Sequence, residues 1–173
     1  MKEIFSIRGL DIFQKNFQQV VLRSKGGDKF KEIINKETSL LPPSSNLTIT
    51  SNDSFLFAKH SFDQWNLFYL EEKKHQDVLK FVSTVNSDEE ILASDYSYGQ
   101  VYFEISGEKR NYYLNKLTHF DLREKKFPVS TMAQTLIAKI DCSIYHLKDK
   151  YLITCNSSFE DYFRERLLDS VNV

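Results

Sequence analysis

Few side chains in this chain of 173 residues could take part in chemistry. Asp141 opens the apolar run IDCSIYHL. A carboxylate at the start of a strand can hold or abstract a proton if it is partly buried, and it is otherwise an exposed residue on the polar face. Asp95, in SDYSYG, precedes another strand and favours a turn cap. Arg23 follows VVL, where it could bind an anion or form an ion pair.

The sequence contains none of the glycine-rich, nucleophile or zinc motifs GxxxxGK[ST], GxGxxG, GxSxG and HExxH. None of the four histidines has a second histidine three or four positions away. Cys142 and Cys155 lack the spacing of a zinc site. They could face each other across a hairpin, although we favour a reduced pair in the cytosol. We therefore predict no catalytic residue and no metal site.

The charge balance excludes two classes of partner. The net charge is −1, from 23 basic and 24 acidic residues, so no overall positive field is present to attract nucleic acid or an anionic membrane. No apolar run approaches the roughly 20 residues that a membrane span needs. Glu3, Arg8 and Asp11 interrupt any signal-peptide core at the N-terminus. We expect a cytoplasmic protein.

Strand and helix signals alternate along the chain. Strands are predicted over 17–24, 47–50, 55–58, 66–70, 91–94, 99–106, 132–137, 140–146 and 151–155. Helices are predicted from 28 onward, over 71–85 and 109–117, and from 157 onward. This order predicts an α+β fold made of a duplicated strand–helix–three-strand–helix unit. We expect a single domain over 1–173, built from similar halves at about 1–86 and 90–173.

Aromatic residues mark two further candidate positions. Trp65, the only tryptophan, lies in SFDQWNLFYL and is expected to anchor the core or an interface. In the last helix, Ser157 and Glu160 have the spacing of a capping box. One helical face is then predicted to carry Phe159, Tyr162, Phe163 and Leu167. Phe159 and Tyr162 are therefore candidates for partner contact or structural support.

Several short stretches occur in a recognisable order. They are QQVVLR (18–23), LLPPSSN (40–46), FDQWNLFYL (62–70), DYSYGQVYFEISG (95–107), FDLREKKFPVSTMAQTLIAKI (120–140) and SSFEDYFRERLLDS (157–170). Their order and spacing resemble the gamma subunit of heterotetrameric sarcosine oxidase. That family is similar in fold to the folate-binding domains of the glycine-cleavage T-protein and of YgfZ-like proteins, a duplicated α+β domain. The Lys-Gly-Cys-Tyr signature of the YgfZ-like branch is absent.

The resemblance implies an accessory subunit of a complex. The resembled oxidase converts sarcosine, tetrahydrofolate and O2 to glycine, 5,10-methylenetetrahydrofolate and H2O2. The resemblance implies alpha, beta and delta subunits as partners. FAD, FMN, NAD and tetrahydrofolate would be bound by the larger subunits, and no cofactor by this chain.

The alternative is a stand-alone folate-binding or aminomethyltransferase-like protein. In the T-protein, a carboxylate within a Gly-Ile-Ile-Asp-Asp segment is tied to folate chemistry. The corresponding residues here are 138–142, which retain Asp141. The resemblance therefore makes Asp141 a weak folate-binding candidate.

Overall fold

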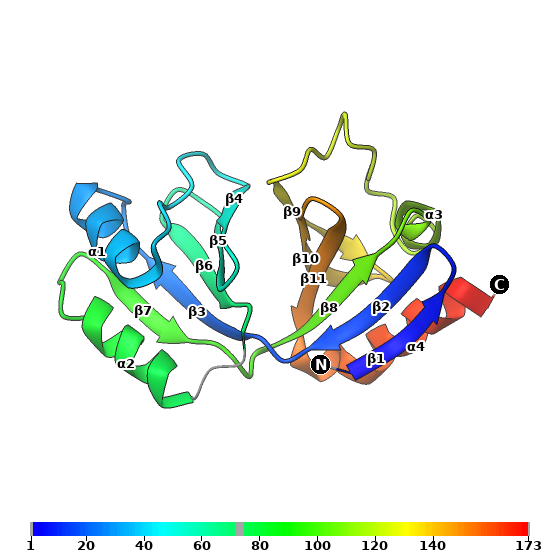
Figure 1. Cartoon of the computed structure of the whole chain (residues 1–173), viewed down its shortest axis with the longest axis horizontal. Coiled ribbons are helices and arrows are strands. Elements are labelled where there is room, and N and C mark those ends of the chain that lie inside the picture. The colour runs from blue at the N-terminus through cyan, green and yellow to red at the C-terminus, as the bar shows by residue number, and fades with distance from the viewer. Residues whose placement is uncertain (1, 72–74, 173) are drawn as a thin grey trace. The chain divides into compact units, whose positions relative to one another are not determined.

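The computed structural model describes residues 2–71 and 75–172, which form two compact units (Figure 1). Unit 2 is continuous, from Phe17 to Ser97, and unit 1 comprises the residues up to Asn16 and from Tyr98 onward. Each unit consists of one antiparallel sheet with helices packed on one face. None of the helices in the described ranges is both apolar enough and long enough to span a bilayer.

The sheet of unit 2 has the strand order β4-β5-β6-β3-β7. Its elements are β3 (Gln18–Arg23), α1 (Asp28–Thr38), β4 (Thr48–Ser51), β5 (Phe55–Lys59), β6 (Gln64–Tyr69), α2 (His75–Val85) and β7 (Leu92–Asp95). The helices supply Phe30, Ile34, Val78 and Phe81 to a core that also holds Val20, Leu22 and Leu67 of the strands. The apolar positions of both helices thus recur at helical spacing because they face one side of this sheet.

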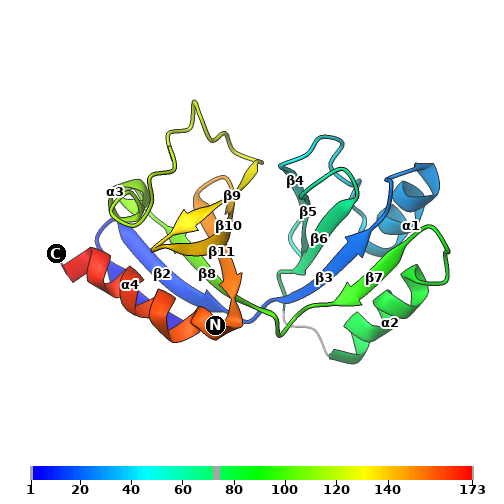
Figure 2. The same ribbon diagram turned by 180° about the vertical axis from the view of Figure 1, so that it is seen from behind.

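The sheet of unit 1 has the strand order β1-β2-β8-β11-β10-β9. Its elements are β1 (Lys2–Ile7), β2 (Leu10–Lys15), β8 (Gln100–Ser106), α3 (Arg110–Leu114), β9 (Met132–Ile137), β10 (Ile140–His146), β11 (Lys150–Asn156), the 3-10 turn η1 (Ser157–Phe159) and α4 (Glu160–Asn172). Figure 2 shows α4 lying along β2. Phe163 of α4 packs on Phe103 of the neighbouring strand β8, with ring centroids 5.1 Å apart. Phe163 and Leu167 are buried in the core of this unit.

The two units repeat one topology, and they exchange one strand each. The series β8-α3-β9-β10-β11-α4 follows the order of β3-α1-β4-β5-β6-α2, which confirms the predicted fold class. However, β2 leads directly into β3 yet pairs with β8, and β7 leads into β8 yet pairs with β3. The unit boundaries therefore differ from the predicted halves, 1–86 and 90–173, at these strands. That the whole chain is one domain stays a prediction.

The sequence missed the first two strands and overestimated one helix. The hairpin of β1 and β2 was not predicted. The helix predicted over 109–117 ends at Leu114, where the amides of Leu117 and Thr118 both bond the carbonyl oxygen of Leu114 in a turn. The helix predicted over 71–85 is α2 from His75 onward, and its residues 72–74 lie outside the described residues.

The turn of the β1–β2 hairpin lies against the end of β8. The amide of Lys109 donates to the carbonyl oxygen of Gly9 at 2.8 Å. Gly107 has φ of +100°, and a Cβ added there would lie 2.4 Å from that same oxygen. Glycine is required at position 107 both for its backbone angle and for this close approach.

Candidate functional site

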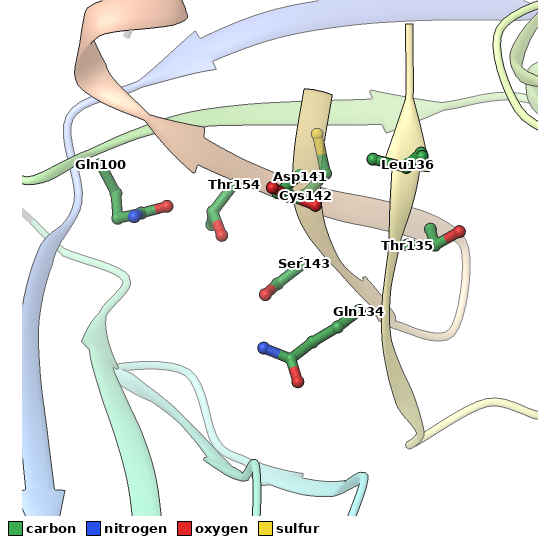
Figure 3. Close-up of a pocket in the computed structure, with 8 residues that line it drawn as sticks. All are labelled: Gln100, Gln134, Thr135, Leu136, Asp141, Cys142, Ser143 and Thr154. Atoms are coloured by element: carbon green, nitrogen blue, oxygen red, sulfur yellow. The ribbon is translucent and has the colours of Figure 1, made fainter. Parts of the chain in front are cut away.

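A polar pocket of about 570 Å³ lies on the sheet of unit 1 (Figure 3). Its lining residues come from four adjacent strands: Gln100 from β8, Thr154 from β11, Asp141, Cys142 and Ser143 from β10, and Gln134, Thr135 and Leu136 from β9. Successive side chains alternate between the two faces of a strand. Because Val101, Ile144 and Cys155 face the core, Gln100, Ser143 and Thr154 project from the opposite face.

Strand register places the polar groups of this pocket in a row. Ser143 is directly opposite Thr154 on one side and Gln134 on the other. Figure 3 shows these three side chains and Gln100 gathered over one part of the sheet. Hydroxyl and amide groups can both donate and accept hydrogen bonds. The pocket is therefore equipped to bind a polar molecule.

Asp141 is the one charged residue of the pocket lining. It lies opposite Leu136 at the start of β10, and it is exposed. The sequence made a chemical role of Asp141 depend on partial burial, and its side chain is exposed. The polar-face alternative is the correct one. Of the six residues singled out from the sequence, only Asp141 lines the pocket.

Arg23 and Asp95 both have local partners. The guanidinium Nη1 of Arg23 lies 3.2 Å from Oδ1 of Asp63 and 3.1 Å from Oε1 of Gln64, so the ion-pair alternative is correct. Asp95 Oδ1 accepts hydrogen bonds from the amide of Ser97 at 3.0 Å and from its hydroxyl at 2.6 Å. This is the predicted turn cap at the end of β7.

Trp65 anchors the core of unit 2. It is buried, and its ring centroid lies 5.0 Å from that of Phe30 and 5.7 Å from that of Phe57. Its indole N–H donates to the carbonyl oxygen of Ser24 at 3.3 Å, while the ammonium of Lys59 lies 4.6 Å from the ring centroid. Of the two predicted roles, core or interface anchor, its burial in this cluster supports the core role.

The aromatic face predicted for the last helix is divided. Phe163 and Leu167 are buried, whereas Phe159 and Tyr162 remain 45% and 43% exposed. Tyr162 donates its hydroxyl to the carbonyl oxygen of Ala138 at 3.3 Å. Phe159 departs from the predicted face because it belongs to the 3-10 turn, whose residues do not follow the α-helical period. Tyr162 lies within α4 and is at the exposed margin of that face.

The predicted capping box was also wrong. Asn156 is the cap, and its Oδ1 accepts from the amide of Ser158 at 3.0 Å and from its hydroxyl at 2.8 Å. Glu160 does not close a box with Ser157. Its Oε1 instead accepts from the side-chain amide of Gln14 in β2 at 2.8 Å. The helical segment begins with a 3-10 turn one residue earlier than the box requires, which makes Asn156 the N-cap.

One buried group, His60, was not singled out by the sequence pattern. His60 follows β5, and burial lowers its pKa to about 4. Its Nε2 lies 2.9 Å from Nδ2 of Asn66. Cys142 and Cys155 are buried free thiols. Across residues 2–71 and 75–172, no three His, Cys, Asp or Glu side chains form a cluster that could hold a metal ion.

Comparison with solved structures identifies the fold. The chain is similar to one in heterotetrameric sarcosine oxidase from Corynebacterium sp. U-96 in complex with pyrrole 2-carboxylate, with a TM-score of 0.83 and 17% identity over 98% of this chain and 87% of that one. It is also similar to glycine cleavage system aminomethyltransferase T from Bartonella henselae, with a TM-score of 0.66 and 11% identity over 93% of this chain and 46% of that one.

Sequence comparison with curated proteins finds no match. A family model does match: the model of the sarcosine oxidase, gamma subunit family covers residues 46–172. The matched region begins just before β4 and ends with α4, so it contains the last four strands of unit 1 and the pocket. The chain belongs to the sarcosine oxidase gamma subunit family.

Proposed function

We propose that the chain is an accessory, non-catalytic subunit of a sarcosine-oxidase-like flavoenzyme complex. The observation that carries this proposal is the family match over residues 46–172. The complex would convert sarcosine, tetrahydrofolate and O2 to glycine, 5,10-methylenetetrahydrofolate and H2O2. Its alpha, beta and delta subunits would be the partners, and the larger ones would hold FAD, FMN, NAD and tetrahydrofolate. The complex would be cytoplasmic and would need neither nucleic acid nor a membrane.

The chemistry of the pocket supports an accessory role. In the register, Ser143 lies between Thr154 and Gln134. The lining residues include no histidine or lysine that could take a proton from a hydroxyl, and their one carboxylate, Asp141, is exposed. A hydroxyl becomes a strong nucleophile only with such a base. These residues can orient a bound group through hydrogen bonds.

Co-purification tests the assignment. The tagged chain is expressed together with the large subunits, and the eluate is separated by size while flavin absorbance is recorded. We expect the chain to elute with the flavin, and the rate of sarcosine-dependent peroxide formation to fall when the chain is omitted. Elution of the chain alone, beside an assembled and fully active oxidase, would overturn the proposal.

The exposed aromatic residues of the last helical segment are candidates for partner contact. Phe159 and Tyr162 are 45% and 43% exposed, and aromatic side chains often dominate the energy of an interface. We expect the double variant Phe159→Ala and Tyr162→Ala to need an at least tenfold higher subunit concentration to elute with the flavin. Tyr112→Ala, a change at a 64% exposed residue of α3, is the matched control. Equal effects of the two variants would exclude this surface.

A second candidate function is folate binding by the isolated chain. It is favoured by Asp141, which lies in the polar pocket, and by the likeness in fold to aminomethyltransferase T. Titration with 5-formyltetrahydrofolate should then show saturable binding that weakens at least tenfold in Asp141→Asn. Asp149→Asn, at an exposed turn, should bind unchanged. No binding at millimolar folate would remove this candidate.

A further inference from the structure

The two cysteines of the chain are neighbours in the central part of the sheet of unit 1. Cys142 of β10 lies directly opposite Cys155 of β11. Both are free thiols, and only 4% and 1% of their surfaces are exposed. The sequence left open whether they face each other across a hairpin, and the register shows that they do.

The hydrogen-bond pattern of the hairpin shows which kind of pair they form. At the Lys148-Asp149 turn, Leu147 and Lys150 exchange backbone bonds of 2.9 and 3.4 Å. Hydrogen-bonded and non-hydrogen-bonded pairs alternate along an antiparallel ladder. Counting back from Leu147 makes Cys142 and Cys155 a non-hydrogen-bonded pair. In such pairs the Cα atoms are about 4.5 Å apart, within the roughly 4.4–6.8 Å that a disulfide spans.

We propose that Cys142 and Cys155 are a site of reversible two-electron oxidation, at which hydrogen peroxide closes a cross-strand disulfide. In the first step a cysteine thiolate attacks one peroxide oxygen, the O–O bond breaks, and a sulfenic acid and hydroxide form. In the second step the other sulfur attacks the sulfenic sulfur, the S–O bond breaks and the S–S bond forms. In total, two thiols and one H2O2 give one disulfide and two waters, so sulfur is oxidised and peroxide is reduced.

The two thiols share a hydrogen bond. The thiolate is the reactive form of cysteine. The sulfur that loses its proton is therefore the one that peroxide oxidises, and the other resolves the sulfenic acid.

The pair connects the two strands that form the floor of the polar pocket. Asp141 and Ser143 flank Cys142, and Thr154 precedes Cys155. A disulfide would fix the spacing of β10 and β11 at this point and would keep the width of the pocket constant. The proposed oxidase complex would release the oxidant beside this chain. Only that source of peroxide rests on the proposed function, and the chemistry of the pair does not.

Mass spectrometry of the isolated full chain tests the proposal. Reduced protein is treated with one equivalent of H2O2, then unfolded and exposed to N-ethylmaleimide. We expect no alkylation and a tryptic product that links Ile140–Lys148 to Tyr151–Arg164, which dithiothreitol separates. Because the bond closes a loop of about 15 residues, the oxidised chain should also melt roughly 6–12 °C higher.

Single-cysteine variants test the sulfenic acid intermediate. In Cys142→Ala and in Cys155→Ala, dimedone should trap a sulfenic acid at the remaining cysteine, which has lost the partner that would resolve it. Two alkylated thiols after peroxide treatment of the unsubstituted chain, unlinked sulfinic acids, or cross-links only between molecules would each overturn the proposal. These readouts do not involve the large subunits, so they are separate from the test of the accessory role.

Discussion

Replacing Gly107 with alanine should destabilise the protein more than the same replacement at Gly9, Gly26 or Gly27. Gly107 has φ of +100°, and an added Cβ would lie 2.4 Å from the oxygen, 2.6 Å from the carbonyl carbon of Gly9 and 2.9 Å from the amide nitrogen of Leu10. All three atoms are backbone, so no side chain can rotate away. The β1–β2 turn would have to move away from the end of β8.

The expected cost has two parts. A left-handed backbone angle costs a residue with a Cβ about 1–2 kcal/mol. Forcing an extra carbon into a packed site costs about 1–3 kcal/mol. Together they give about 2–5 kcal/mol, and one kcal/mol corresponds to roughly 2–4 °C in a chain of this size. The melting temperature of Gly107→Ala should therefore fall by about 10 °C.

Thermal unfolding followed by circular dichroism measures this effect. Gly27→Ala is the matched control, because Gly27 precedes α1 in an extended conformation and a Cβ there meets nothing within 4 Å. Its melting temperature should change by no more than about 2 °C. A fall of less than about 3 °C in Gly107→Ala would refute the argument that the Gly9 turn is held rigidly against β8.

Three further predictions concern the packing of Trp65, the protonation of His60 and the cap at Asn156. Trp65→Ala should cost about 3–5 kcal/mol in urea denaturation, while Phe62→Ala, at a 74% exposed residue, should cost less than about 0.5 kcal/mol; similar values would contradict the core role of Trp65. Burial lowers the pKa of His60 to about 4 in the folded chain. Below the ordinary histidine pKa of about 6.5, the unfolded chain therefore binds more protons than the folded chain does. About 3 kcal/mol of the free energy of unfolding should be lost as the pH falls from about 6.5 to about 4. Comparison of unfolding free energies with His60→Gln at pH 7.5 and 4.5 isolates this loss, and an equal loss in both proteins would disprove it. Asn156→Ala should lower the free energy of unfolding by about 1 kcal/mol, and Ser157→Ala should leave it almost unchanged. The opposite ranking in the same assay would support the capping box of Ser157 and Glu160.

Two strands of unit 1 were predictable from the sequence. The runs over 132–137 and 140–146 were predicted with the boundaries that β9 and β10 have. The N-terminal hairpin was not, because β1 has exposed residues at both ends and only two partly buried ones at its centre. Without an alternating pattern, its assignment depends on β2 pairing with β8, which lies far along the chain.

The pocket shows a second limit of sequence reasoning. Asp141 and Ser143 lie on one face of β10, as alternation along a strand requires. Gln100, Thr154 and Gln134 come from three other strands, and only the strand order and register bring them beside Ser143. Likewise, Asn156 and Ser157 are both good caps by residue type, and the position of the 3-10 turn selects between them.

The exchange of β2 and β7 also sets an order in which the chain can fold during synthesis. Unit 2 is complete once Ser97 has emerged, since β7 supplies its last strand. The hairpin of β1 and β2 is made first, yet β8, its partner, begins only at Gln100. At about 5–20 residues per second, the hairpin waits on the order of 5–20 s. A two-stranded hairpin is marginally stable alone, so the nascent chain carries an unpaired strand edge while its neighbour in sequence is already folded.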